Sequence, residues 1–274
     1  MRLSRIGVCI AVVSAYLVLR FAVLWIKPTF ANPHLATILY TSLLMFVQLA
    51  LVVGIARLQL RLRSAALLAI PNVVITAALI YIEMKLSART PAPQAALGIV
   101  SIFRSLFLMM FAGFLGYTIS FIVREKNILL PAAVFAALVD YWNVSWGPLS
   151  HILVDKPSVV AAAAVAMPAV SAGMPGMVIG MGDFVFLSLF FGVLYRFSMN
   201  VKGTFWLGYG LLTVSMLAVM YFGSAFPALI PMSLAVVAAN AKLFKLKREE
   251  QLAMVYVGAI LLITLGIFFF RWYK

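Results

Sequence analysis

The chain has 274 residues, of which 65% are hydrophobic and only 10% are charged, and its formal net charge is +14. Soluble domains are about half apolar and a quarter charged, so this composition excludes a soluble globular protein and predicts a polytopic membrane protein. The lysines and arginines stand in small groups beside apolar runs, as at the ends of membrane helices, which argues against nucleic-acid binding.

Apolar runs of about 20 residues predict nine transmembrane helices. Because helices satisfy their own backbone hydrogen bonds in lipid, and no run alternates polar and apolar residues, we expect an all-α helical bundle. No polar stretch is long enough for a separate soluble domain, so residues 1–274 are expected to form a single transmembrane domain. The first run is too long for the core of a signal peptide, and we expect it to be an uncleaved span. In chain order the predicted spans are about 6–26, 35–56, 64–86, 95–123, 128–148, 177–198, 203–222, 225–241 and 252–271.

The basic residues predict which side of the membrane each loop faces. With the N-terminus in the cytoplasm, the inner loops hold most of them, so we expect a cytoplasmic N-terminus and an outer C-terminus. The inner group is Arg2, Arg5, Arg57, Arg61, Arg63, Arg124, Lys126, Arg196, Lys202, Lys242, Lys245, Lys247 and Arg248. The outer group is Lys27, Lys85, Arg89, Lys156, Arg271 and Lys274. Short loops without extra domains favour a prokaryotic cell membrane.

Two features complicate this topology. Residues 157–170 are apolar but short, which favours a re-entrant or interfacial segment. If they spanned the membrane instead, the basic residues 242–248 would lie outside, against the charge rule. Arg20 and Arg104 fall inside predicted spans, where a cation is expected to snorkel toward the interface or to pair with a neighbouring polar group.

Two acidic residues, Asp140 and Asp183, interrupt the middle of hydrophobic runs, whereas the other acids lie at helix ends or in loops. A carboxyl group in hydrocarbon is costly, so an intramembrane acid indicates a functional site. Asp140 precedes Pro148 by eight residues and Asp183 follows Met177 by six, which at about 1.5 Å per residue places them roughly 12 Å and 9 Å below the outer helix ends. Antiparallel neighbouring helices would therefore carry both acids at nearly the same depth.

Such a pair has a definite chemistry. Two carboxyl groups that share a site do not both ionise easily, so one keeps a proton while the other acts as a base. Together they can activate water for attack on a peptide carbonyl, without a metal or a cofactor. The same acids would also fit a proton- or ion-coupled transporter or channel, which is the alternative. The chain has no HExxH pattern, and its single cysteine, Cys9, excludes a disulfide and a cysteine-based metal site.

Two short motifs accompany the acids. Gly180, Met181 and Gly182 precede Asp183 in a GxGD pattern, and glycines there allow close approach by a partner helix or a substrate, although a small-residue packing face would have the same pattern. Two spans later the sequence FPALIPMS opens a short helix with two prolines, which free backbone carbonyls for protein or a water-lined cavity. Exposed backbone of this kind can bind an extended peptide by strand addition.

The combination of an Asp in one span, GxGD in the next and Pro-Ala-Leu two spans later resembles the presenilin and signal peptide peptidase group of intramembrane aspartyl proteases. Residues 180–192, GMGDFVFLSLFFG, are similar to that group's GxGDFxFxSxxxG stretch, and FPALIPMS is similar to its PALxxxS region. The resemblance covers about residues 128–241. That group usually has Tyr-Asp at its first motif, whereas here Val139 precedes Asp140 and Tyr141 follows it.

The resemblance implies a presenilin-like bundle and an aspartic endopeptidase that cleaves transmembrane helices. It makes residues 128–241 the catalytic core, between the N-terminal helices of 1–127 and a basic loop with a final helix at 242–274. The site residues that it implies are Asp140 and Asp183 as the catalytic pair, Gly180, Met181 and Gly182 as the shapers of the active site, and Pro227, Ala228 and Leu229 as binders of substrate. The expected partners are transmembrane peptides or proteins and the lipid bilayer, and no cofactor is expected. An outward-running Asp140 helix is similar to signal peptide peptidase rather than presenilin, so we expect a preference for substrate helices whose N-termini face the cytoplasm.

Overall fold

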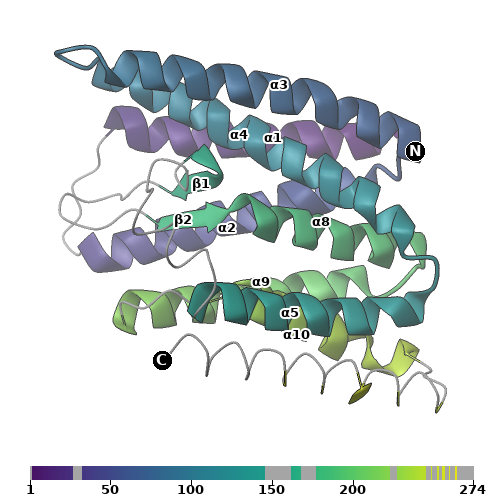
Figure 1. Ribbon diagram of the computed structural model, residues 1–274. Helices are drawn as coiled ribbons and strands as arrows, with labels where there is room; N and C mark the ends of the chain where they lie inside the picture. Colours follow the sequence, from purple (N-terminus) through teal and green to yellow (C-terminus); the bar gives the residue numbers. More distant parts are fainter. Residues whose placement is uncertain are drawn as a thin grey trace. The chain divides into compact units, whose positions relative to one another are not determined.

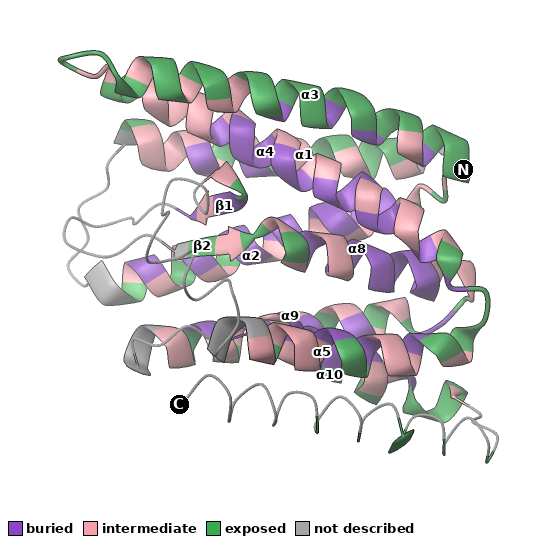
Figure 2. Cartoon of the chain, viewed as in Figure 1, coloured by how far each residue is buried: buried purple, intermediate pink, exposed green. Residues whose placement is uncertain are grey.

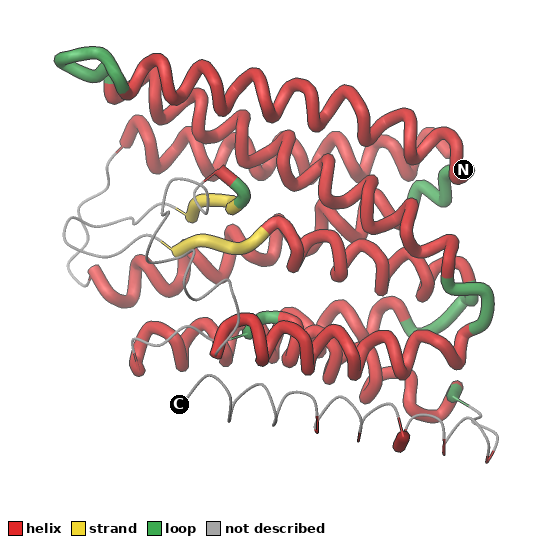
Figure 3. Tube along the Cα trace, in the orientation of Figure 1, coloured by secondary structure: helices red, strands yellow, loops and turns green. Residues whose placement is uncertain are grey.

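The computed structural model describes residues 2–26, 33–145, 162–167, 177–222 and 227–244, with isolated positions from 248 onward. This described part is mostly helical and contains one two-stranded sheet (Figure 1, Figure 3). The chain divides into two compact units. The first unit comprises Met1–Ile122 and Ser158–Arg196, and the second comprises Val123–Pro157 and Phe197–Lys274.

The first unit is organised around one central helix, α4. Its elements are α1 (Arg2–Ile26), α2 (Pro33–Arg57), α3 (Leu62–Ser87), α4 (Gln94–Ile119) with the short 3-10 turn η1 (Ser120–Ile122), β1 (Ala164–Met167), β2 (Met177–Gly180) and α8 (Met181–Arg196). Helix α4 packs against α3, α8, α2, α1 and strand β1. Figure 2 shows the consequence, because buried residues concentrate on α4 and α8 whereas α3 is exposed along most of its length.

The second unit contains the 3-10 turn η2 (Lys126–Ile128), α5 (Leu129–Ser145), α9 (Val201–Phe222), α10 (Leu229–Asn240) and the 3-10 turn η3 (Ala241–Leu243). Helix α10 packs against both α5 and α9. The C-terminal end of α10 is tied to the start of α9, because the Asn240 amide donates to Thr204 Oγ1 at 2.9 Å and accepts the backbone N–H of Asn200 at 2.8 Å. These bonds fix the two helices against each other at one end.

Four of the described helices are long and apolar enough to cross a membrane: Arg5–Trp25, Leu35–Arg57, Leu62–Ser87 and Gln94–Ile122. Helix α3 has small and polar residues on its buried face, including Ala65, Ala69, Asn72 and Thr76, and large apolar side chains such as Leu67 on its exposed face. A helix in water would have the opposite distribution. The long apolar helices indicate a membrane protein, as the composition predicted.

The predicted spans correspond to helices through most of the described chain, but one prediction is wrong at its start. Residues 177–180 form strand β2 rather than the first turn of the predicted span 177–198, and they pair antiparallel with residues 164–167. The helical rise assumed from Met177 to Asp183 is therefore also wrong, because an extended residue advances about 3.3 Å. The predicted re-entrant segment 157–170 contributes β1 in its described part. Most of the predicted last span, 252–271, lies outside the described residues.

Candidate active site

The first candidate catalytic acid, Asp140, lies on α5 in the second unit and is half-buried. Its Oδ2 atom accepts a hydrogen bond of 2.9 Å from the backbone N–H of Leu229, the first residue of α10. The two residues are 89 positions apart in the sequence. The structure thus joins the acid to the Pro-Ala-Leu motif, two features that the sequence resemblance placed in one site.

The start of α10 explains why this bond forms. The first N–H groups of a helix have no partner within the helix and need an acceptor from elsewhere. The next amides of α10 find acceptors nearby, because Ile230 donates to the Pro227 carbonyl and Met232 to the Ala228 carbonyl, both at 3.4 Å. The Leu229 N–H is satisfied instead by the Asp140 carboxyl group. A negatively charged acceptor at a helix N-terminus is also favoured by the helix dipole.

The Pro-Ala-Leu residues line the buried side of this contact. Pro227 and Leu229 are buried and Ala228 is half-buried. One turn further along α10, Ser233 is buried at 5% exposure, and its hydroxyl has no hydrogen-bond partner among the described residues. Phe226, which opens the FPALIPMS sequence, lies outside the described residues.

The second candidate acid, Asp183, lies in the first turn of α8 in the first unit and is half-buried. Strand β2 runs directly into this helix (Figure 1), so the acid sits just beyond the end of a strand. A carboxyl group in the first turn of a helix lies near the positive end of the helix dipole. The side chain folds back toward Gly180, because a Cβ atom at that glycine would lie 3.6 Å from Asp183 Oδ2.

The glycines of the GxGD pattern keep the space before Asp183 open. Gly180 and Gly182 are exposed, and no described atom lies within 4 Å of where a Cβ at Gly182 would be. Met181 is half-buried, and its backbone N–H donates to the Ala163 carbonyl at 3.0 Å, which extends the ladder between the strands. Their predicted role in shaping an active site stays a prediction.

The rest of the GxGDFxFxSxxxG stretch fixes α8 against α4. Ser188 donates through Oγ to the Gly113 carbonyl. A Cβ atom at Gly116 would collide with the Val185 carbonyl oxygen, and a Cβ at Gly192 would lie 2.7 Å from Ser120 Oγ. Without side chains at these glycines the two helices approach closely. The small residues of α4 were not assigned to the site from sequence, although Ala112 and Gly116, four residues apart in an apolar helix, form a recognisable packing signal.

The described structure therefore brings the predicted residues together in two groups. Asp140 joins Leu229 in the second unit, and Gly180 lies beside Asp183 in the first. Among the described residues, no three histidine, cysteine or carboxylate side chains gather as a metal site would require. No family model matches the chain, and neither a curated protein nor a solved structure matches it.

Proposed function

We propose that the protein is an intramembrane aspartyl protease that hydrolyses peptide bonds of transmembrane helices with Asp140 and Asp183 as its catalytic pair. The observation that carries the proposal is the hydrogen bond from the Leu229 N–H to Asp140 Oδ2. Two unrelated apolar helices would have no reason to bring an acid on one next to a Pro-Ala-Leu sequence on the other. An active site that combines a catalytic acid with a substrate-binding motif would bring the two together.

In the proposed reaction the two carboxyl groups hold one proton between them. The ionised group accepts a proton from water as the water oxygen attacks the peptide carbonyl. The protonated group donates its proton to the developing oxyanion, which gives a tetrahedral gem-diol. The carboxyl group that took the proton from water then gives it to the amide nitrogen as the C–N bond breaks, and the other carboxylate takes a proton back from a gem-diol hydroxyl, so that an amine and a carboxylic acid leave. The Leu229 N–H orients the Asp140 carboxyl group during this reaction.

The substrate must become extended near the scissile bond, because a helix hides its own carbonyl groups. Strand β2 supports a place for such a segment. The bond from Met181 to Ala163 sets the phase of the ladder, so that the backbone groups of Val178 and Gly180 point away from β1. Val178 is 56% exposed. An extended peptide that pairs with this edge would run past the start of α8, where Asp183 lies.

The proposal includes a nine-helix, presenilin-like arrangement in a prokaryotic cell membrane, with the N-terminus in the cytoplasm. The four long apolar helices and the distribution of basic residues support it. The remaining spans would be formed by α5, by β2 with α8, by α9, by α10 and by residues 252–271.

The direct test is a cleavage assay with the purified protein, reconstituted in liposomes with a single-span peptide. Wild-type protein should cleave the peptide, and Asp140→Asn and Asp183→Asn should each reduce kcat at least about a thousandfold. Glu125→Gln is a matched control, because it removes a carboxylate outside the apolar runs and should leave kcat unchanged. Proton or ion flux that depends on Asp140 and Asp183, without any cleavage, would instead establish the transporter alternative.

A further inference from the structure

Two buried arginines bind strand β1, which pairs with β2, the strand that leads into the helix of Asp183. Arg104 lies on α4 and Arg20 on α1, and each is 4% exposed. A buried cation in a membrane protein is costly and persists where it has definite partners. These two do not snorkel to the surface. Their partners are the backbone carbonyl groups of Ala164 and Ala166 in β1 and of Ala162, two residues before the strand.

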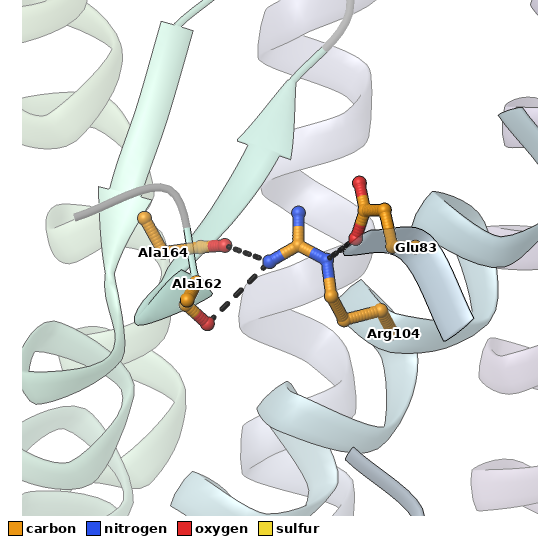
Figure 4. Close-up of polar contacts among 4 residues, drawn as sticks. All are labelled: Glu83, Arg104, Ala162 and Ala164. Carbon is orange, nitrogen blue, oxygen red and sulfur yellow. Dashed lines mark hydrogen bonds and ion pairs between the residues drawn. The ribbon is translucent and has the colours of Figure 1, made fainter. Parts of the chain in front are cut away.

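Arg104 uses one planar group to reach two elements at once. Its Nε atom forms an ion pair of 2.7 Å with Glu83 of α3, while Nη1 donates to the carbonyls of Ala162 and Ala164 at 3.4 Å and 3.3 Å (Figure 4). The ion pair neutralises the cation and orients the guanidinium toward the strand. Arg20 Nη1 adds a bond of 2.6 Å to the Ala166 carbonyl.

The three carbonyls that the arginines bind belong to alternate residues, at 162, 164 and 166. In a strand, alternate backbone groups point to the same edge. The opposite edge faces β2, because the Ala163 carbonyl accepts the Met181 N–H at 3.0 Å and Ala164 pairs with Gly180. The guanidinium groups therefore bind both outward-facing carbonyls of β1, those of Ala164 and Ala166, and the inner edge of the strand carries β2.

A short chain of bonds thus leads from the arginines to the candidate acid. Arg104 donates to the carbonyls of Ala162 and Ala164, on both sides of Ala163. The Ala163 carbonyl accepts the backbone N–H of Met181, the first residue of α8. Asp183 follows two residues later in the same helical turn. We infer that Arg104, oriented by Glu83, and Arg20 are positioning residues that clamp β1, fix the register of β2 and thereby set the place of Asp183.

The clamp has a second consequence for the substrate. Because the arginines bind the outward carbonyls of β1, we expect an extended peptide to add to the outer edge of β2, next to Asp183. This inference rests on the proposed protease function where it concerns the substrate, whereas the clamp itself can be tested without any cleavage.

The test combines amide hydrogen exchange with steady-state kinetics on the full-length protein in liposomes. One variant, Glu83→Gln with Arg104→Gln, removes both charges together, so that no unpaired charge stays buried. Arg20→Gln removes the second contact. Arg196→Gln is the matched control, since Arg196 also donates to a backbone carbonyl, that of Ser120, but is the last residue of α8, at the opposite end of the helix from the strands.

The expected result is faster exchange at the amides of Val165 and Met181, by about ten- to a hundredfold in the double variant, as the loss of charge-assisted hydrogen bonds implies. The same variant should lose at least about tenfold in kcat, because the register of β2 is released and Asp183 is displaced. Arg20→Lys should restore most of the activity, since a lysine can replace a single bond. Arg104→Lys should not, because an ammonium group lacks the planar fork that spans Glu83 and two carbonyls.

Unchanged exchange at Val165 and Met181 in both the double variant and Arg20→Gln would overturn the clamp, and so would an equal acceleration in Arg196→Gln. Faster exchange with an unchanged kcat would overturn the positioning of Asp183. If the wild-type protein cleaves no peptide, the proposed function fails, and the exchange rates alone then decide whether the arginines hold the register of β1 and β2.

Discussion

The backbone N–H of Leu229 donates to Oδ2 of Asp140 at 2.9 Å, and this single bond connects α10 to α5 at the candidate site. Replacing Leu229 by its α-hydroxy acid analogue, leucic acid, changes the amide to an ester, which removes the N–H group and weakens the Ala228 carbonyl as an acceptor for Met232. We expect kcat/KM to fall about tenfold, because a carboxylate loses a charge-assisted hydrogen bond that orients it. The measurement is cleavage of a single-span peptide by the ester variant, which is made by semisynthesis or by nonsense suppression with the hydroxy acid.

The matched control is the same ester at residue 230, whose N–H donates to Pro227 at 3.4 Å and does not reach either acid. A loss of equal size at both positions would show that the ester disturbs the helix start in general, and would refute a specific role of Leu229 in orienting Asp140.

Helix α8 is held to α4 by glycines, which gives a prediction about stability. A Cβ atom at Gly116 would collide with the Val185 carbonyl oxygen and would lie 2.9 Å from Ser188 Cβ, so Gly116→Ala should push the helices apart. Overpacking of this kind costs about 1–3 kcal/mol, which corresponds to a fall on the order of 5 °C in the midpoint of thermal unfolding in detergent.

Gly210→Ala provides the comparison, because no described atom lies within 4 Å of the new methyl group on α9. There the substitution should leave the unfolding midpoint unchanged or raise it slightly, since alanine favours a helix over glycine. Equal midpoints for the two variants would contradict the close packing of α4 and α8.

Much of the fold follows from the sequence, because long apolar runs in lipid have few alternatives to a helix. The strands could not be predicted in the same way. Residues 164–167 and 177–180 are short and apolar, and periodicity does not separate a buried strand of four residues from part of a helix. Their pairing depends on contacts with residues far away in the sequence, because Arg20 and Arg104 donate to carbonyls on the outer edge of β1.

The sequence indicated which residues to consider for the candidate site, but it did not indicate the hydrogen bond between Leu229 and Asp140. Asp140, within an apolar run, and the Pro-Ala-Leu sequence could be assigned to one site only through a family resemblance, since nothing in their spacing brings residues 140 and 229 together. The N–H of Leu229 is a backbone group, which carries no signal in the side-chain sequence. The two arginines had a sequence signal, a cation within an apolar run, and the expected pairing with polar groups is confirmed for both.

The predicted orientation of the chain and the proposed function together predict which substrates are cleaved. With a cytoplasmic N-terminus, the Asp140 helix runs outward, and we expect cleavage of single-span substrates whose N-termini face the cytoplasm. The measurement is co-expression in bacteria with two substrates that share one hydrophobic sequence but insert in opposite orientations. Asp183→Asn serves as the inactive control. Cleavage of only the substrate with an outer N-terminus would contradict the predicted topology.

The central claim is that Asp140 and Asp183 meet in one site, and disulfide cross-linking tests it most directly. In a Cys9→Ser background, which has no other cysteine, Asp140→Cys with Asp183→Cys should form an intramolecular disulfide under mild oxidation, because that bond requires Cα atoms within about 7 Å. Asp140→Cys with Val193→Cys is the control, since Val193 lies about 15 Å further along α8. The account predicts a cross-link in the first pair and none in the second. Absence of a cross-link between positions 140 and 183, in protein that is folded and oxidised, would contradict it.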